Sequence, residues 1–142
     1  MAVDKLPPHD TEAEEAVIAS LLVDAEAIYR VANILKPEDF FREKNAWAFE
    51  ACLALWDRRE TINQITVAHE LARKGHLDDM GGSAYLSQLI SDLPTPIGAE
   101  HYAEIIQRDA SYRKLIGAAQ HIAQLAYQGG SDLGNALGQA ET

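Results

Sequence analysis

Hydrophobic positions recur at helical spacing along most of the chain, and no segment shows the alternation typical of a strand. The longest helical segment runs from Ala99 to Gln128, contains no proline and has one glycine, Gly117. At about 1.5 Å per residue, such a helix would be roughly 45 Å long, more than a small domain needs across its diameter. We therefore expect part of it to project as an arm that seeks a partner. The alternative is an ordinary amphipathic helix packed along its own domain.

Two rows of residues at seven-residue steps run along this segment and predict a seam for another helix. One row also contains a polar residue, Arg108. The part of the seam that we expect to support self-association lies toward the end of the segment. The rows consist of Ile105, Tyr112, Ala119 and Ala126, and of Arg108, Leu115 and Ile122.

Five shorter helical patterns precede the arm, and each begins at a residue suited to start a helix. These residues are Asp10 or Thr11, Asp24, Asn45, Asn63 and Ser83. A turn at Lys36–Phe41 separates the second pattern from the third, and the fourth ends at Gly75. The apolar positions expected to form the core are Ala13, Val17, Ile18, Leu21, Leu22, Ile28, Val31, Ala32, Leu35, Phe49, Cys52, Leu53, Trp56, Ile65, Ala68, Leu71, Ala72, Leu86, Leu89, Ile90 and Leu93.

The fold class predicted from these patterns is all-α, with a compact multi-helix head, a long helix and a truncated helical hairpin. Residues 1–8 form an extended lead-in, 9–97 the head, and 98–142 the long helix and the start of a returning helix, in one structural domain. Pro94-Thr95-Pro96 separates the head from the arm, and Gly129-Gly130-Ser131 ends the arm. Asp132 can cap a last helix that carries Leu133 and Leu137. Because Thr142 comes soon afterwards, we expect most of the returning helix to be missing.

The composition restricts the classes of partner. Of 142 residues, 47% are hydrophobic and 24% are charged, and the net charge is −10. A surface this acidic repels phosphate and suits a basic protein partner better than nucleic acid. We find no apolar run long enough for a membrane helix and no signal peptide. The single cysteine, Cys52, fits a reducing cytoplasm and is interpreted as a core residue.

The residues that enzymes and metal sites require do not come together in this sequence. Gly129 and Gly134 have the spacing of a phosphate-binding loop, but Asn135 and Ala136 follow where a lysine and a hydroxyl residue are needed. His69-Glu70 begins like a zinc-protease helix, but Arg73 stands in place of the second histidine. We therefore expect no catalytic, cofactor-binding or metal-binding residues, and favour a binding or assembly domain over an enzyme. An unrecognised hydrolase is a less favoured alternative.

Four ordered blocks, none specific alone, together resemble a known family over nearly the whole chain. They are Leu6-Pro7-Pro8 with Glu12-Ala13-Glu14; Lys36-Pro37-Glu38-Asp39-Phe40-Phe41; Ile62-Asn63 with Thr66-Val67 and Leu71; and Gly75-His76-Leu77 through Gly81-Gly82-Ser83-Ala84-Tyr85-Leu86. Pro94-Thr95, Tyr102-Ala103 and Arg113 extend the match. In this order, the chain resembles the N-terminal domain of the DnaB-family replicative DNA helicases of bacteria. It departs from that family's usual residues at Asn45, Thr61 and Asn63.

The resemblance implies a helical head and hairpin that help form the collar of a hexameric ring. It also implies primase as a partner and, in some systems, a helicase loader. ATP, Mg and single-stranded DNA would be bound by a separate C-terminal domain that carries out unwinding. The other open interpretation is an acidic protein-binding or nucleic-acid-binding helical module unrelated to a helicase.

The family's primase contacts lie on and near the hairpin, so we expect partner-binding residues on the exposed part of the arm and its flanks. An aromatic ring beside a charge is a frequent anchor at protein interfaces. In the alternative interpretation, Tyr102 and Ile105 instead face the head as core residues. The candidate partner-binding residues are Tyr102, Ile105, Arg108, Asp109 and Tyr112, and the candidate self-association seam is Leu115, Ala119, Ile122 and Ala126.

Overall fold

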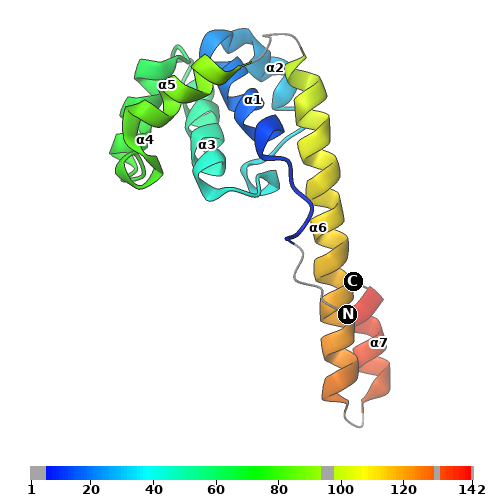
Figure 1. Cartoon of the computed structure of the whole chain (residues 1–142). Coiled ribbons are helices and arrows are strands. Elements are labelled where there is room, and N and C mark those ends of the chain that lie inside the picture. Colours follow the sequence, from blue (N-terminus) through cyan, green and yellow to red (C-terminus); the bar gives the residue numbers. More distant parts are fainter. Residues whose placement is uncertain (1–5, 94–97, 130–131, 142) are drawn as a thin grey trace.

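The computed structural model describes residues 6–93, 98–129 and 132–141, and these residues form helices and turns without a strand. The α-helices of the head are α1 (Thr11–Val23), α2 (Ile28–Val31), α3 (Glu43–Asp57), α4 (Gln64–Arg73) and α5 (Gly82–Asp92). Three short 3-10 helices span Ala25–Ala27, Pro37–Asp39 and Asp78–Met80. The long helix α6 (Ala99–Gln128) leaves the head, and α7 (Leu133–Glu141) turns back beside its far end (Figure 1). The all-α prediction and the expected hairpin are confirmed.

Helix α1 lies at the centre of the head because almost every side of it is apolar. It packs against α3, α5 and α6, and Figure 1 shows it between α3 and α6. Asp10 caps it by accepting a hydrogen bond from the Ala13 backbone N–H at 3.0 Å. The buried stretch from Ala16 to Leu22 has no exposed position, so this helix carries the centre of the core.

The predicted starts at Asn63 and Asp24 hold, whereas α5 begins at Gly82, one residue before the predicted Ser83, because the left-handed Gly81 stands at its N-cap. The side chain of Asn63 accepts from the Thr66 backbone N–H at 3.0 Å, and the Thr66 hydroxyl accepts from the Asn63 backbone N–H at 2.9 Å. This reciprocal arrangement satisfies donors that the first turn of a helix otherwise leaves unpaired. Asp24 caps a 3-10 turn that runs directly into α2. Helix α4 ends before Gly75, whose φ of +80° is the left-handed conformation that glycine adopts easily.

The prediction that Asn45 caps α3 was wrong. The helix begins at Glu43, and Asn45 lies inside its first turn with its side chain fully buried. There it donates to Glu14 of α1 at 3.1 Å and accepts from the Tyr85 hydroxyl of α5 at 2.5 Å. Glu14 is itself buried and also accepts from the Phe41 backbone N–H at 2.6 Å. The asparagine therefore joins three helices instead of ending one.

The core prediction for α4 was wrong at two of its four positions. Ile65 is 67% exposed and Ala72 is exposed, whereas Ala68 and Leu71 are buried as expected. Val67 takes the position assigned to Ile65, because the face formed by Val67, Ala68 and Leu71 meets α3 and α5. Leu53 and Trp56 on α3 are only half-buried, and Leu55 is buried in their place. Pro94-Thr95-Pro96 and Gly130-Ser131 lie outside the described residues.

Candidate interaction surface

The first half of α6 belongs to the head, because one stripe of small and apolar residues packs against α1 and α2. Ala99, Ala103, Ile106 and Ala110 are buried at alternating four- and three-residue steps. Alanine has the smallest apolar side chain, so the helices can approach each other closely along this stripe. Continuing the same spacing reaches Arg113 and then Gly117, where no apolar side chain is available. Packing on the head ends near this point of α6.

Arg113 closes the junction between the arm and the head. Its guanidinium donates to the Pro8 carbonyl at 2.7 Å and to the Asp39 carbonyl at 2.5 Å. It also lies 5.6 Å from the ring centre of Phe41, which stacks on His9 at 4.2 Å. The planar fork of donors of an arginine suits two carbonyl oxygens from separate segments. Arg113 thereby joins the N-terminal lead-in and the Lys36–Phe41 turn to α6.

Two further contacts hold α6 against α2 and the residues that follow it. The Arg30 guanidinium donates to the Glu100 carboxylate at 2.7 Å, and this hydrogen bond lowers the pKa of Glu100 from its usual value. The Gln107 side chain donates to the Ile34 carbonyl at 3.2 Å. Both contacts are exposed and contribute less than the buried stripe, because water competes with them.

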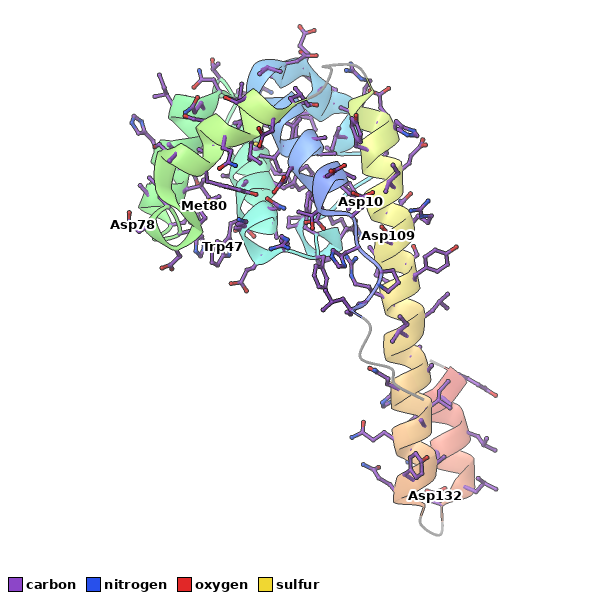
Figure 2. The ribbon with its side chains drawn as sticks, in the orientation of Figure 1. Asp10, Trp47, Asp78, Met80, Asp109 and Asp132 are labelled. Atoms are coloured by element: carbon purple, nitrogen blue, oxygen red, sulfur yellow. The ribbon has the colours of Figure 1, made fainter. Side chains whose placement is uncertain are left out.

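The five candidate partner-binding residues occupy three different environments. Tyr102 and Ile105 are half-buried and pack against the core, as the alternative interpretation of the sequence stated. Arg108 and Tyr112 are exposed, the latter by 50%. Asp109 is only 6% exposed, so the expectation that it lies on the surface was wrong. Figure 2 places it on the part of α6 beside the head. A role in partner binding stays a prediction for all five.

The candidate seam residues all lie on the exposed second half of α6. Leu115 is 65% exposed and Ile122 is 45% exposed, and Ala119 and Ala126 are exposed beside them. Ile116 and Tyr127 are also exposed, and the seven-residue pattern did not include them. Considering every apolar residue of the segment, and not only those at seven-residue steps, would have identified both residues. Their role in self-association is untested, but the exposed apolar surface extends beyond the two predicted rows.

Helix α7 covers only the far end of the arm. Its start is fixed by Asp132, whose side chain accepts from the Asn135 backbone N–H at 2.9 Å and which lies at the tip of the arm (Figure 2). Leu125 of α6 is half-buried near this end, whereas Leu133 and Leu137 of α7 stay exposed. The α6–α7 hairpin therefore presents apolar side chains from both of its helices.

The described residues contain no group of three histidine, cysteine or acidic side chains arranged to hold a metal ion. Cys52 is fully buried, which raises the pKa of its thiol to about 12 and keeps it in the unreactive protonated form. Its interpretation as a core residue is confirmed. None of the described helices is both long enough and apolar enough to cross a membrane. Chemically, the arrangement supports binding through the surface of the arm.

Comparison with known proteins identifies the family. A model of the DnaB-like helicase N-terminal domain matches residues 6–108. The replicative DNA helicase DnaC of Bacillus subtilis is 35% identical over 138 residues. Replicative helicase DnaB of Geobacillus stearothermophilus is 36% identical over the same number. In both cases the match covers 97% of this chain and 30% of the relative, so the chain spans less than a third of these proteins.

Solved structures show the same architecture. The N-terminal domain of DnaB helicase from Mycobacterium tuberculosis matches with a TM-score of 0.92 at 37% identity, covering 96% of each chain. The corresponding domain from Helicobacter pylori, described with its interactions with primase, has a TM-score of 0.71 at 23% identity. That match covers 82% of this chain and 90% of the other, and shows the fold alone. With the family model and the close structural match, the chain belongs to the DnaB-like helicase N-terminal domain family.

Proposed function

We propose that this chain is the N-terminal collar domain of a replicative DNA helicase, which supports ring assembly and docks primase during DNA replication. The observation that carries the proposal is the exposed apolar surface of the second half of α6. In a family whose members include replicative DNA helicases, a projecting apolar arm on an acidic head is suited to assembly. Membership of this family also rules out the interpretation as a module unrelated to a helicase.

The arm has enough apolar surface for association. Leu115, Ile116 and Ile122 lie on the segment that the head leaves uncovered. Fully burying a side chain of this size contributes about 1.5–3 kcal/mol. Because association also costs translational and side-chain freedom, a pair of such arms would be weak in isolation. We therefore propose that the arms of neighbouring subunits pair and that the hexamer of the full-length protein strengthens this pairing.

ATP-driven unwinding, with its ATP, Mg and single-stranded DNA, belongs in this proposal to a C-terminal domain of the parent protein. The fragment itself is proposed to bind partners without catalysis. In this proposal a helicase loader is an additional partner of the parent, and the location is cytoplasmic, where bacterial DNA replicates. These statements rest on the family, because the chain spans 30% of the curated relatives it matches.

The proposed primase contact uses Arg108 and Tyr112, because both side chains are exposed at the point where the arm leaves the head. Tyr102 and Ile105 can contribute their exposed edges, and Asp109 can act by holding Arg108, whose guanidinium lies 3.4 Å from its carboxylate. Primase interactions described for the Helicobacter pylori relative support this partner.

One set of variants tests both parts of the proposal. Leu115→Ser on the arm is compared with Ile65→Ser on the head, since the two side chains are 65% and 67% exposed. Sedimentation over a range of concentrations should show weaker association for Leu115→Ser and no change for Ile65→Ser. Tyr112→Ala and Arg108→Ala are titrated with the C-terminal domain of primase from the same organism. Loss of an interface anchor typically costs about 2 kcal/mol or more, which is roughly a thirtyfold loss of affinity.

Circular dichroism and melting of each variant show whether the fold is kept. Because the hairpin can depend on the rest of the protein, the titration is repeated in the full-length helicase. Equal self-association of Leu115→Ser and Ile65→Ser would contradict the role of the arm in assembly. Unchanged primase affinity in both folded arm variants would place primase elsewhere on the protein.

A further inference from the structure

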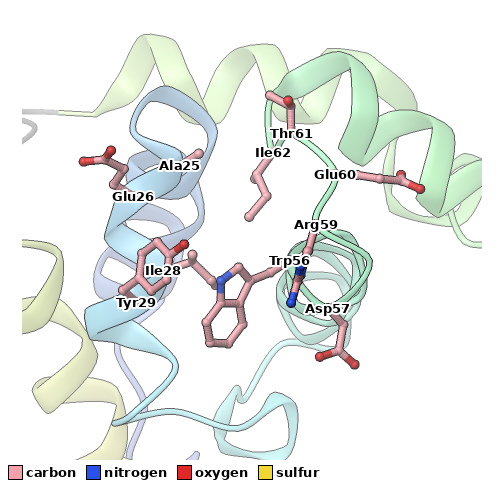
Figure 3. Close-up of a pocket in the computed structure, with 10 residues that line it drawn as sticks. All are labelled: Ala25, Glu26, Ile28, Tyr29, Trp56, Asp57, Arg59, Glu60, Thr61 and Ile62. Carbon is pink, nitrogen blue, oxygen red and sulfur yellow. The ribbon is translucent and has the colours of Figure 1, made fainter.

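An open groove lies on the head, away from the arm, between α2 and the turn that joins α3 to α4. Its floor is apolar and aromatic, with Ile28, Tyr29, Trp56 and Ile62 turned toward the gap (Figure 3). The rings of Tyr29 and Trp56 meet edge to face, with centres 5.5 Å apart. Tyr29 is exposed and Trp56 is half-buried, so both rings leave surface available to a ligand.

Arg59 borders this groove from an unusual backbone conformation. Its φ of +60° makes it the one non-glycine residue in the left-handed region among the residues that the structure describes. The turn is a regular helix end, in which Glu60 N–H donates to the Leu55 carbonyl at 2.8 Å and Arg59 N–H to the Trp56 carbonyl at 3.0 Å. Glycine is the usual residue at this position, because a Cβ atom is disfavoured there. An arginine gives the groove a guanidinium at a cost in backbone strain, which is a pattern typical of binding sites.

The charges around the groove distinguish Arg59 from its neighbour. Arg58 forms ion pairs with Glu60 at 3.0 Å and with Glu70 at 2.7 Å. Within the described part of the chain, no carboxylate forms an ion pair with Arg59. The carboxylates of Glu26, Asp57 and Glu60 belong to the rim and point away from the gap in Figure 3, and that of Glu60 is paired with Arg58. A ligand with a single carboxylate can therefore pair with Arg59, whereas an acidic run would be repelled by the rim.

We propose that this groove is a docking site for a partner peptide that carries one carboxylate beside an apolar side chain. The carboxylate pairs with the guanidinium of Arg59 at the edge of the groove, where the planar fork of donors can engage both oxygens. The apolar side chain packs on Tyr29 and Trp56 above Ile62. This site uses no residue of α6, so it is independent of primase docking on the arm.

The test uses the full 142-residue chain, labelled with ¹⁵N, and the acetylated and amidated pentapeptide Gly-Asp-Leu-Phe-Gly. The signal is the indole N–H of Trp56. Trp47 serves as an internal reference, since it lies nine residues earlier, roughly 13 Å along α3, and stacks on His76. We expect the Trp56 resonance to shift saturably at millimolar peptide while that of Trp47 stays in place. Replacing the aspartate of the peptide by asparagine should weaken binding about tenfold, because a charged hydrogen-bond partner is lost.

Protein variants then locate the contact. Arg59→Gly should bind the aspartate peptide about tenfold more weakly and keep its fold, since glycine suits the turn. Arg59→Lys should keep part of the affinity, and Tyr29→Ala should lower it through the apolar side chain. The proposal is overturned if Trp56 does not respond, if the asparagine peptide binds equally well, or if Arg59→Gly binds unchanged. Tighter binding of a peptide with lysine in place of aspartate would also overturn it, and would make the groove a cation site.

Discussion

Replacing Glu70 by glutamine should destabilise the head, because this carboxylate is buried between two arginines. Its side chain is 2% exposed and accepts from Arg58 at 2.7 Å and from Arg73 at 2.8 Å. The hydrogen bonds from Arg58 and then from Arg73 lower the pKa of Glu70 from 4.5 to about 2. The Arg58 contact connects the end of α3 to α4, so it also supports the turn that carries Arg59.

The size of the effect follows from this pKa difference. One pH unit corresponds to about 1.4 kcal/mol, so the difference between 4.5 and about 2 is worth at most about 3–4 kcal/mol. The side chains of Arg58 and Arg73 are 40% and 61% exposed, and water screens their charges. We therefore expect Glu70→Gln to lower the free energy of unfolding by about 1–2 kcal/mol at pH 7.

The lowered pKa of Glu70 also fixes the direction in which its contribution to stability changes with pH. Because the folded state holds the pKa of Glu70 below its unfolded value, the stabilisation is complete above about pH 4.5 and is lost as the pH falls toward 2. Urea unfolding at several pH values should show a gap between the wild-type protein and Glu70→Gln that is constant near neutrality and closes in acid. Glu60→Gln is the matched control, since Glu60 is 52% exposed and shares only Arg58.

Two results would refute this reasoning. A Glu70→Gln variant as stable as the Glu60→Gln variant at pH 7 would mean that the burial of Glu70 offsets its two ion pairs, which is known for buried charges. A gap that persists unchanged at pH 2 would mean that the loss comes from packing instead of charge.

Asn45→Ala should lower the free energy of unfolding by about 2–3 kcal/mol, because it removes one donor from buried Glu14 and the acceptor of the Tyr85 hydroxyl. Urea unfolding measures this, with exposed Asn33→Ala as control, and equal stability of the two variants would contradict the buried network. Arg113→Ala should release the N-terminal lead-in, because the carbonyls of Pro8 and Asp39 lose their donor. Hydrogen exchange at Ala13 and Glu14, whose backbone N–H groups bond to Asp10, should become faster than in Lys114→Ala, and equal protection in both would show that Arg113 does not hold this segment.

The sequence by itself was sufficient for the local features of this fold. The caps at Asp10 and Asn63 and the helix end before Gly75 depend on residues within a few positions of one another. Such features follow from backbone geometry and are visible in the amino-acid order. The ordered blocks likewise predicted the family to which the chain belongs. Long apolar periodicity predicted α6 over its full range from Ala99 to Gln128.

The tertiary structure decided which face of each helix is buried. The helical period alone does not decide whether Ile65 or Val67 is buried, since both are apolar. Val67 is the buried residue because α3 and α5 pack against its side of α4. In α6, the buried stripe of alanines and Ile106 passes beside the predicted row through Ile105. Small residues give a weak periodic signal, although they allow the closest approach of two helices.

The polar contacts between distant segments also required the structure. Asn45 meets Tyr85, 40 residues later, and Arg113 meets Pro8, 105 residues earlier. A polar residue offers the same local signal whether it caps a helix, faces water or bonds to a distant partner. Its role is set by which groups the fold brings within hydrogen-bond distance, because a buried polar group must find a partner there. Arg58 and Arg59 are adjacent in sequence and give the same local signal. In the fold, however, Arg58 forms an ion pair with Glu70, whereas Arg59 borders an open groove.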